Sequence, residues 1–539
     1  MCAPPYQALA YTGDVDLTRR LALVMATVAS IAACGRTVPA APRPAAAAVA
    51  STAETAETDH GPLAGKLVEG GVRAFLGVPY AAPPVGDLRW RPPADGPRWT
   101  RPRDAQQVGP ACPQLDVPSY ARADEDCLTL NVWSPAGGSP NKPVLFWIPG
   151  GGFVEGSGGY QLYDGARLAR REDAVVVTIN YRIGPLGFLA HPALARELGR
   201  TASPAFGLLD QRAALQWVRR NARAFGGDPA NVTIFGQSAG AFSVCAQLAM
   251  PASRGLFARA IMQSGACADP LYFSARDAAA QGEQLAHALG CTDMACLRAR
   301  DVKTILSALP LKQHYLLPPG VVWGPIVDGV ELPMLPLRAL RDGKAADVPL
   351  LVGWNRDEGI LLTAFYKSVS ADERDSFVRA SFGEAAVVPV AARYAGVDPK
   401  QALDAIFTEG ASACEARRAA RAHAAHGHPT YLYEFTHTLA SPRFHKLGAT
   451  HNVEVWFVFG TEEAGIALAP EELPLSHAMM DAWGRFARTG DPNGADLVWP
   501  RYDAARDELE VLDTVSTTGP ANPRGACDFW DRFEREVAP

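Results

Sequence analysis

The 539-residue sequence lacks several features that would place it in common functional classes. No apolar run is long enough to span a membrane: residues 21–33 form a run of about 13, and a transmembrane helix needs about 20. Positive charge is not in excess, because the net charge is −6, which argues against nucleic acid as a partner. No Cys-x-x-Cys pair with matching histidines is present. We therefore expect no metal and no other cofactor.

The N-terminus carries the pattern of an export signal. Arg19 and Arg20 precede the short apolar run, which ends at Cys34, so we predict a signal segment over residues 1–34. Ile31-Ala32-Ala33-Cys34 is similar to the bacterial lipoprotein box, in which the cysteine is acylated and becomes the mature N-terminus. An ordinary cleaved signal with an incidental cysteine is the alternative. A misassigned upstream start would account for residues 1–14.

Residues 35–60 are rich in Ala, Pro and Thr and show no periodic apolar face, which predicts a flexible tether. Residues 61–539 then form one domain, without a second linker or a repeat. The remaining cysteines suit an oxidising compartment. We expect an exported bacterial protein that is periplasmic, anchored to the outer membrane or extracellular, and that touches a membrane only through a lipid on Cys34. Its oligomeric state stays open.

Short apolar runs alternate with helical patterns along this domain. Residues 144–148, 174–179, 232–235 and 348–352 are typical of buried strands, and residues 207–225 and 239–250 are typical of helices. Further helices are expected at 411–426 and 476–488. The alternation predicts an α/β fold with a mostly parallel central sheet flanked by helices.

The sharpest motif is Gly236-Gln237-Ser238-Ala239-Gly240, between the strand at 232–235 and the following helix. This context is that of a nucleophile elbow in the α/β-hydrolase fold, where a tight turn exposes the serine hydroxyl and flanking glycines relieve crowding. We predict Ser238 as a nucleophile. The fold requires an acid and then a histidine later in the chain. The pattern leaves four histidines open: His437, His445, His451 and His477.

Three consecutive glycines, 150–152, follow the strand at 144–148. Backbone N–H groups there can approach a substrate oxygen because no Cβ stands in the way. The triple glycine therefore predicts part of an oxyanion hole.

From about residue 61 onward the chain resembles the type-B carboxylesterases, the family of the cholinesterases and the bacterial para-nitrobenzyl esterases. The resemblance is carried by the blocks at residues 76–86, 125–131, 150–152, 207–212, 225–229, 356–359 and 489–493. It implies Glu358 as the acid and selects His451 as the base, with Asp357 the rival to Glu358. It also implies Gly151, Gly152 and Ala239 as oxyanion donors and Ser264 as a supporting residue near the acid.

The same resemblance implies three disulfides and two buried ion pairs. The disulfides are Cys112–Cys127, Cys291–Cys296 and Cys414–Cys527, which leaves Cys245 and Cys267 unpaired. The ion pairs are Arg89–Glu125 and Arg182–Asp210.

Departures from the cholinesterases bear on the substrate. Gln237 stands where they have Glu, the loop from Cys112 to Cys127 contains no Trp, and Pro319 and Val321 fall near their acyl-pocket phenylalanines. These changes remove support for a quaternary ammonium group. We expect hydrolysis of small neutral esters through an acyl-enzyme. An amidase, thioesterase or lipase using the same triad stays possible, and a non-catalytic cholinesterase-like binding protein is disfavoured because all three triad residues are present.

Overall fold

The computed structural model describes residues 54–533, apart from 138–139, 266, 269–270, 312–319, 464, 496 and the side chain of residue 524. The predicted signal segment with Cys34, most of the predicted tether, and Pro319 lie outside the described residues. The domain expected from residue 61 begins earlier, because β1 (Glu54–Thr58) pairs antiparallel with β2 (Gly61–Val68). His60, expected in the tether, is buried between Asp59 and Asp95.

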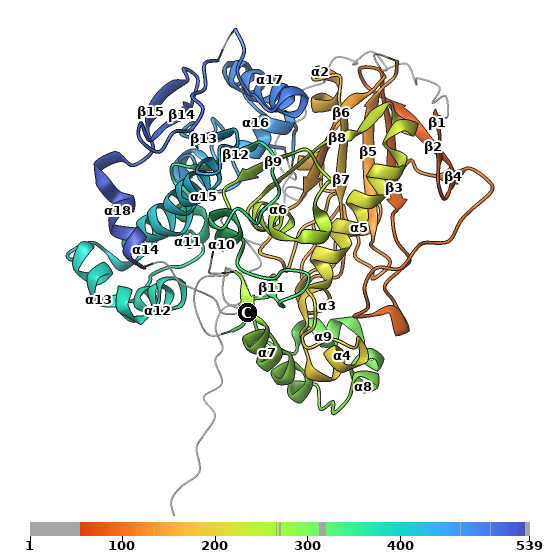
Figure 1. The fold of residues 1–539 in the computed structure, drawn as a ribbon, viewed down its shortest axis with the longest axis horizontal. Helices are drawn as coiled ribbons and strands as arrows, with labels where there is room; N and C mark the ends of the chain where they lie inside the picture. Colours follow the sequence, from red (N-terminus) through yellow and green to blue (C-terminus); the bar gives the residue numbers. More distant parts are fainter. Residues whose placement is uncertain are drawn as a thin grey trace, which may run out of the picture.

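A thirteen-stranded sheet runs through the described part of the chain (Figure 1). Its order is β1-β2-β3-β5-β7-β6-β8-β9-β12-β13-β14-β15, and β4 pairs with β2. The six pairings from β7 across to β14 are parallel, and those at both margins are antiparallel except β2–β4. The other strands of this sheet are β3 (Val72–Pro79), β4 (Arg103–Asp104), β5 (Thr129–Pro135), β6 (Lys142–Ile148), β7 (Val175–Ile179), β8 (Gly227–Gln237), β9 (Arg259–Gln263), β12 (Leu350–Asn355), β13 (Thr430–Phe435), β14 (Glu508–Leu512) and β15 (Thr517–Pro520).

Helices cover both faces of this sheet, as the alternating pattern predicted. The longer ones include α5 (Phe206–Asn221), α6 (Ala239–Ala249), α15 (Cys414–Ala424) and α17 (Leu473–Thr489). Shorter ones are α2 (Ala166–Arg171), α3 (Gly184–Phe188), α4 (Pro192–Glu197), α10 (Pro336–Arg341), α11 (Glu358–Thr363), α16 (Glu454–Phe459) and α18 (Ala526–Trp530). The predicted helix at 411–426 begins inside a π-helical turn, Phe407–Ala413, that precedes α15.

Strand β6 shows how one apolar sequence serves two cores. Val144 and Phe146 belong to the core that contains residues of α5 and α6, whereas Leu145 and Trp147 belong to the core beneath α16 and α17. Successive side chains of a strand point to opposite faces, so a strand buried on both sides is apolar on both faces. All seven residues of β6 are buried, and all are apolar except the first, Lys142, which pairs with Asp173.

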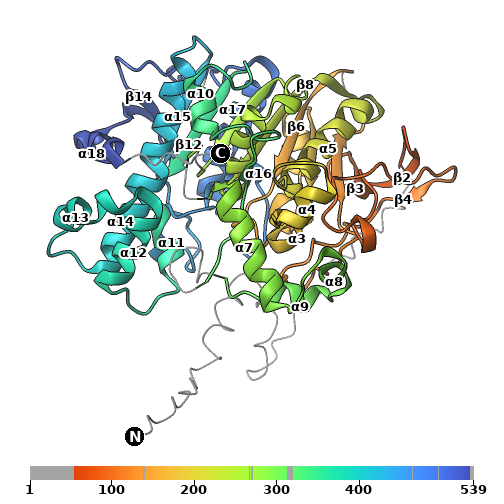
Figure 2. The same cartoon turned by 60° about the horizontal axis from the view of Figure 1, so that its bottom comes forward.

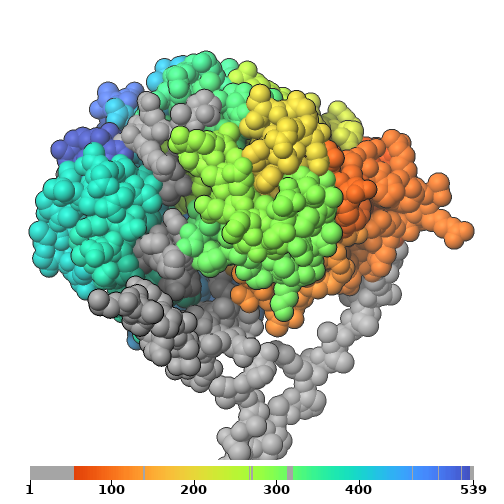
Figure 3. Space-filling model, turned by 90° about the horizontal axis from the view of Figure 1, so that it is seen from below, coloured from red at the N-terminus to blue at the C-terminus, as the bar shows by residue number. Residues whose placement is uncertain are grey.

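Two helical groups lie on the face seen from below (Figures 2 and 3). One contains α7 (Ala275–Ala288), α8 (Met294–Ala299) and α9 (Val302–Ser307), near the two-stranded sheet of β10 (Phe273–Ser274) and β11 (Ile326–Val327). The other contains α12 (Ala371–Phe382), α13 (Glu384–Arg393) and α14 (Pro399–Ile406), which have a small core of their own. None of the described helices is both long and apolar enough to cross a membrane.

Candidate active site

Ser238 lies on the turn between β8 and α6 in an unfavourable backbone conformation. Its φ is 55° and its ψ is −126°, outside the regions that L-residues normally adopt. The N–H of Ser238 donates to the carbonyl of Gln263 at 2.9 Å, and the carbonyl of Ser238 accepts from Ala241 and Phe242 at the start of α6. Strained non-glycine residues held by surrounding hydrogen bonds concentrate at functional sites. The geometry is that of a nucleophile elbow.

The flanking glycines are required by close backbone packing. A Cβ on Gly240 would lie 2.0 Å from the carbonyl oxygen of Ile148, and a Cβ on Gly236 would lie 2.7 Å from the same oxygen. Gly265 is equally constrained, because its Cβ would lie 2.4 Å from the Cβ of Ala241 and 3.0 Å from the carbonyl oxygen of Ser238. The turn therefore fits between β6 and β9 only without these side chains.

His451 and Glu358 are joined by a short hydrogen bond. His451 Nδ1 is 2.5 Å from Glu358 Oε2, and Glu358 is fully buried. The other carboxylate oxygen of Glu358 accepts from the backbone N–H of Asn355 at 2.8 Å, which orients it. Burial disfavours the imidazolium form, but the Glu358 carboxylate outweighs this effect and raises the pKa of His451 above its ordinary value. This arrangement stabilises the charged form of His451.

The rival acid and the other three candidate histidines take no part in the His451–Glu358 pair. The carboxylate of Asp357 pairs with Arg356 and accepts from the N–H of Ala449, so it supports the loop that carries His451. His437 lies between Asp513 and Glu472. His445 is exposed in a short 3-10 helix, and His477 lies on α17.

Gln237, immediately before Ser238, is buried and reaches the other side of the imidazole. Its Nε2 lies 3.1 Å from His451 Nε2. Since Nδ1 faces Glu358, Nε2 is the nitrogen left to accept a hydrogen bond. Gln237 therefore occupies a position where a carboxylate would add negative charge directly beside the base.

A second buried carboxylate, that of Glu454, lies beside the first and was not predicted from the sequence. Glu454 begins α16, three residues after His451, and accepts from Asn355 Nδ2 at 2.5 Å and from Gln263 Nε2 at 3.2 Å. Burial and the neighbouring Glu358 raise the pKa of Glu454 to about 7. The family resemblance selects His451 through the block Gly448-Ala449-Thr450-His451-Asn452-Val453-Glu454, which contains this residue, so the signal was present in the sequence.

The glycine loop packs on the elbow. A Cβ on Gly150 would lie 2.6 Å from the carbonyl oxygen of Gln237 and 3.1 Å from the Cβ of Ser238. Gly151 and Gly152 have positive φ values of 112° and 57°, which glycine adopts without strain. Gly151 and Gly152 follow Gly150 directly, and Ala239 follows Ser238 as the first residue of α6. Their role as oxyanion donors stays a prediction.

Ser264 is also close to the elbow. It is buried, with φ at 51°, and its N–H donates to the carbonyl of Gly353 in β12. Its hydroxyl has no hydrogen-bond partner among the described residues. Of the acyl-pocket positions, Val321 is partly buried and forms an isolated bridge with Leu311.

Four disulfides are formed in the described part of the chain, one more than expected. Three are the implied pairs Cys112–Cys127, Cys291–Cys296 and Cys414–Cys527. The fourth joins Cys245 of α6 to Cys267, so the expectation that these two are unpaired is wrong. They are 22 residues apart in sequence and meet only because α6 packs against the segment after β9. Four disulfides are typical of proteins from oxidising compartments.

Both implied ion pairs are present and bidentate. Arg89 donates to Glu125 through Nε and Nη2 at 2.7 and 2.6 Å. Arg182 donates to Asp210 through the same two nitrogens, both at 2.7 Å. Arg182–Asp210 joins the segment after β7 to α5, and Arg89–Glu125 joins the segment after β3 to the loop that ends at Cys127.

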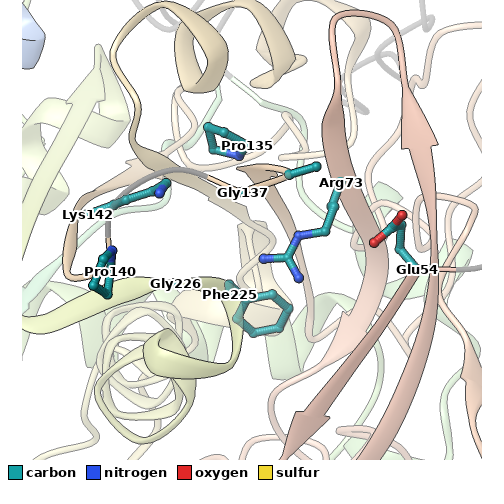
Figure 4. Close-up of a pocket in the computed structure, with 9 residues that line it drawn as sticks. Glu54, Arg73, Pro135, Gly137, Pro140, Lys142, Phe225 and Gly226 are labelled. Atoms are coloured by element: carbon teal, nitrogen blue, oxygen red, sulfur yellow. The ribbon is translucent and has the colours of Figure 1, made fainter.

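A cavity of about 390 Å³ lies at the amino ends of the parallel strands, opposite the end that carries Ser238 (Figure 4). Arg73, Lys142, Glu54 and Phe225 are among its lining residues. Lys142 begins β6, whereas the glycine loop follows the last residue of that strand, so the cavity is separate from Ser238. Within the described residues, no group of three or more His, Cys, Asp or Glu side chains is placed to hold a metal ion.

An elbow serine, a histidine–glutamate pair and a glycine loop at the carboxyl ends of parallel strands define the α/β-hydrolase class. Comparisons with known proteins agree. A model of the carboxylesterase family matches residues 52–530. The para-nitrobenzyl esterase of Bacillus subtilis is 36% identical over 85% of this chain and 95% of that protein. The fumonisin B1 esterase of Sphingopyxis macrogoltabida is 37% identical, covering 85% and 87%, and the acetylcholinesterase of Bungarus fasciatus is 33% identical, covering 87% and 84%.

Solved structures show the same relationship. A para-nitrobenzyl esterase superposes with a TM-score of 0.79 at 35% identity, over 88% of this chain and 98% of that one. A thermophilic para-nitrobenzyl esterase superposes with a TM-score of 0.80 at 34% identity, covering 89% and 100%. The chain therefore belongs to the carboxylesterase family. It is a serine esterase, a hydrolase of carboxylic esters.

Proposed function

We propose that the chain hydrolyses neutral carboxylic esters with Ser238 as nucleophile, His451 as general base and Glu358 as the acid that orients it. The hydrogen bond of 2.5 Å between His451 and Glu358, beside the strained elbow, carries the proposal. Elsewhere in the described chain, His437 also contacts carboxylates, but no nucleophile elbow adjoins it.

The chemistry follows from the geometry. Ser238 Oγ attacks the ester carbonyl as its proton passes to His451, and the carbonyl electron pair becomes an oxyanion held by the N–H groups of Gly151, Gly152 and Ala239. Collapse of this intermediate expels the alcohol, which takes the proton from His451, and leaves the acyl group on Ser238. Water, deprotonated by His451, then attacks the acyl group and restores the serine. Glu358 stabilises the imidazolium that forms in both steps.

Substitution of the triad tests this assignment. Ser238→Ala and His451→Ala should each lower kcat for p-nitrophenyl acetate by about 10⁴-fold or more, because the three residues act as a unit. His445→Ala is the matched control and should retain full activity. An active, folded Ser238→Ala enzyme would contradict the proposal.

The preferred substrates are neutral esters with aryl or short-to-medium alkyl groups. Gln237 places an amide rather than a carboxylate beside His451, so a cationic head group gains no charge attraction there. One cation–π contact contributes about 0.5–2 kcal/mol, and the Cys112–Cys127 loop has no Trp to provide it. The test is kcat/KM for acetylcholine against 3,3-dimethylbutyl acetate at matched ionic strength. A clear preference for acetylcholine would contradict the proposal.

Comparing an ester with the anilide of the same acid separates esterase from amidase activity.

We also propose export, with acylated Cys34 as the mature N-terminus. The four disulfides support an oxidising compartment, and residues 31–34 support lipidation. In its native host, Cys34→Ser should move the protein out of the membrane fraction. Intact-mass analysis that finds an unmodified N-terminus elsewhere would contradict lipidation.

A further inference from the structure

The loop that contains the proposed oxyanion donors doubles back on itself. The carbonyl of Gly151 accepts from the N–H groups of Val154 and Glu155, both at 3.0 Å. A Cβ on Gly156 would lie 2.2 Å from the carbonyl oxygen of Gly150. The segment at 155–156 therefore lies directly against Gly150 and Gly151, and a shift of one moves the other.

Gln114 holds this second segment. Its side chain is buried, and its amide forms four hydrogen bonds. Oε1 accepts from the N–H of Gly156 and from the hydroxyl of Tyr160, both at 3.0 Å. Nε2 donates to the carbonyls of Gly156 at 3.1 Å and of Cys112 at 3.0 Å. Two donors face the oxygen and two acceptors face the nitrogen, so these partners determine the orientation of the amide.

Gln114 is itself firmly anchored. It lies two residues after Cys112, whose disulfide closes the loop at Cys127. Backbone hydrogen bonds join Ala111, just before Cys112, to Arg122 and Asp124 in that loop. The loop thus provides a rigid support from which one side chain reaches the glycine loop.

We propose that Gln114 is a positioning residue for the oxyanion hole. The inference rests on the proposed function, which makes Gly151 and Gly152 the donors. An oxyanion hole works because its N–H groups point in advance at the place where negative charge develops. Gln114 fixes both backbone polar groups of Gly156, and through Gly156 it fixes the position of Gly150 and Gly151. Loss of this contact should weaken transition-state binding more than substrate binding.

The decisive variant is Gln114→Met, which keeps the length of the side chain and removes all four hydrogen bonds. We expect kcat for p-nitrophenyl acetate to fall roughly 10- to 100-fold with little change in KM, since misplaced donors act on the transition state. Gln107→Met is the control, because Gln107 is exposed in a nearby segment. Tyr160→Phe, which removes one of the four bonds, should give a smaller loss in the same direction.

Inhibition by a trifluoromethyl ketone distinguishes misplaced oxyanion donors from a general loss of protein stability. Ser238 adds to its carbonyl carbon, the proton passes to His451, and the resulting hemiketal oxyanion occupies the hole. For Gln114→Met and Tyr160→Phe, the inhibition constant should rise in proportion to the loss of kcat/KM. Unchanged inhibition constants in folded Gln114→Met, or in Tyr160→Phe if the first variant does not fold, would overturn the inference. Failure of the proposed function itself would appear separately, as activity in Ser238→Ala.

Discussion

The two ends of the parallel strands differ in how tightly the chain is packed. At the carboxyl ends, Ser238 is strained, and a Cβ on Gly240 would lie 2.0 Å from the carbonyl oxygen of Ile148. At the amino ends, a cavity of about 390 Å³ opens beside Arg73 and Lys142, and a Cβ on Gly226 would meet no atom within 4 Å. The proposed esterase site lies at this crowded end. Polar groups that converge on a strained turn indicate the site, whereas the large cavity lies at the other end of the strands.

Replacing a glycine by alanine should lower the stability more at the carboxyl ends of the strands than at their amino ends. Gly240→Ala forces a Cβ into the backbone of β6, so we expect a loss of roughly 3 kcal/mol or more in the free energy of unfolding. Gly226→Ala has open space and only the penalty of a left-handed residue, about 1–2 kcal/mol. Denaturant unfolding of both variants measures the difference. Equal destabilisation would show that the crowding at Gly240 relaxes.

The buried carboxylates at the crowded end should make stability depend on pH. The pKa of Glu454 is raised to about 7, so the folded state binds its proton more tightly than the unfolded state, where the pKa is near 4.5. The contribution to stability is full below about pH 4.5 and is lost as pH rises through 7. The change amounts to about 3 kcal/mol at most.

Glu454→Gln should remove this pH-dependent part of the unfolding free energy. We therefore expect a flatter dependence of unfolding free energy on pH between about 4.5 and 7 than in the wild type. Denaturant titrations at several pH values measure the slope, and Glu508→Gln is a control because Glu508 is half-exposed on β14, next to the edge strand β15. Equal slopes in Glu454→Gln and wild type would contradict the raised pKa.

Charge beside His451 should shift the pH profile of catalysis. His451 acts as a base only when neutral, so kcat/KM falls as pH drops through its pKa. Gln237→Glu places a carboxylate where the amide nitrogen now lies 3.1 Å from Nε2, which stabilises the imidazolium and raises that pKa. The acid limb of kcat/KM should move to higher pH, with several-fold lower activity near pH 6. Gln237→Met, without the charge, should not move the limb upward.

The smallest effect on catalysis is expected from a substitution beside the cavity, at the amino ends of the strands. Arg73 donates to Ser134 and lines the cavity, at the opposite end of the strands from Ser238. Arg73→Ala should leave kcat/KM for p-nitrophenyl acetate unchanged within about twofold, apart from any loss of stability. A large loss of kcat in a folded variant would mean that the two ends are coupled.

Local patterns were sufficient to predict the fold class and to single out Ser238 as the candidate nucleophile. Strand β6 is apolar at nearly every position because both its faces are buried, and this pattern is visible without a structure. Likewise the Gly-x-Ser-x-Gly motif is visible within five consecutive residues, although the crowding that requires Gly240 comes from the carbonyl of Ile148 in β6. The start of the domain was misplaced because β1 has only one buried residue and lies at the margin of the sheet, where the apolar signal is weak.

The partners of the nucleophile could not be derived from local pattern. Four histidines stayed open until family resemblance selected His451, and the structure then placed it against Glu358, 93 positions away in sequence. The Cys245–Cys267 pair was missed because nothing in a spacing of 22 residues indicates that α6 packs against the segment after β9. Gln114 was missed because a buried glutamine in a loop carries no sequence signal.

By itself, the sequence predicted the α/β fold from periodicity and Ser238 as the nucleophile from a five-residue motif, and its resemblance to a known family gave the esterase class. Only the tertiary structure decided how Glu358, Glu454 and Gln237 surround His451, how Gln114 holds the glycine loop, and which cysteines meet. These contacts join residues from separate elements. Their distances follow from how the strands order and how the helices pack on them, and no local stretch of sequence contains that information.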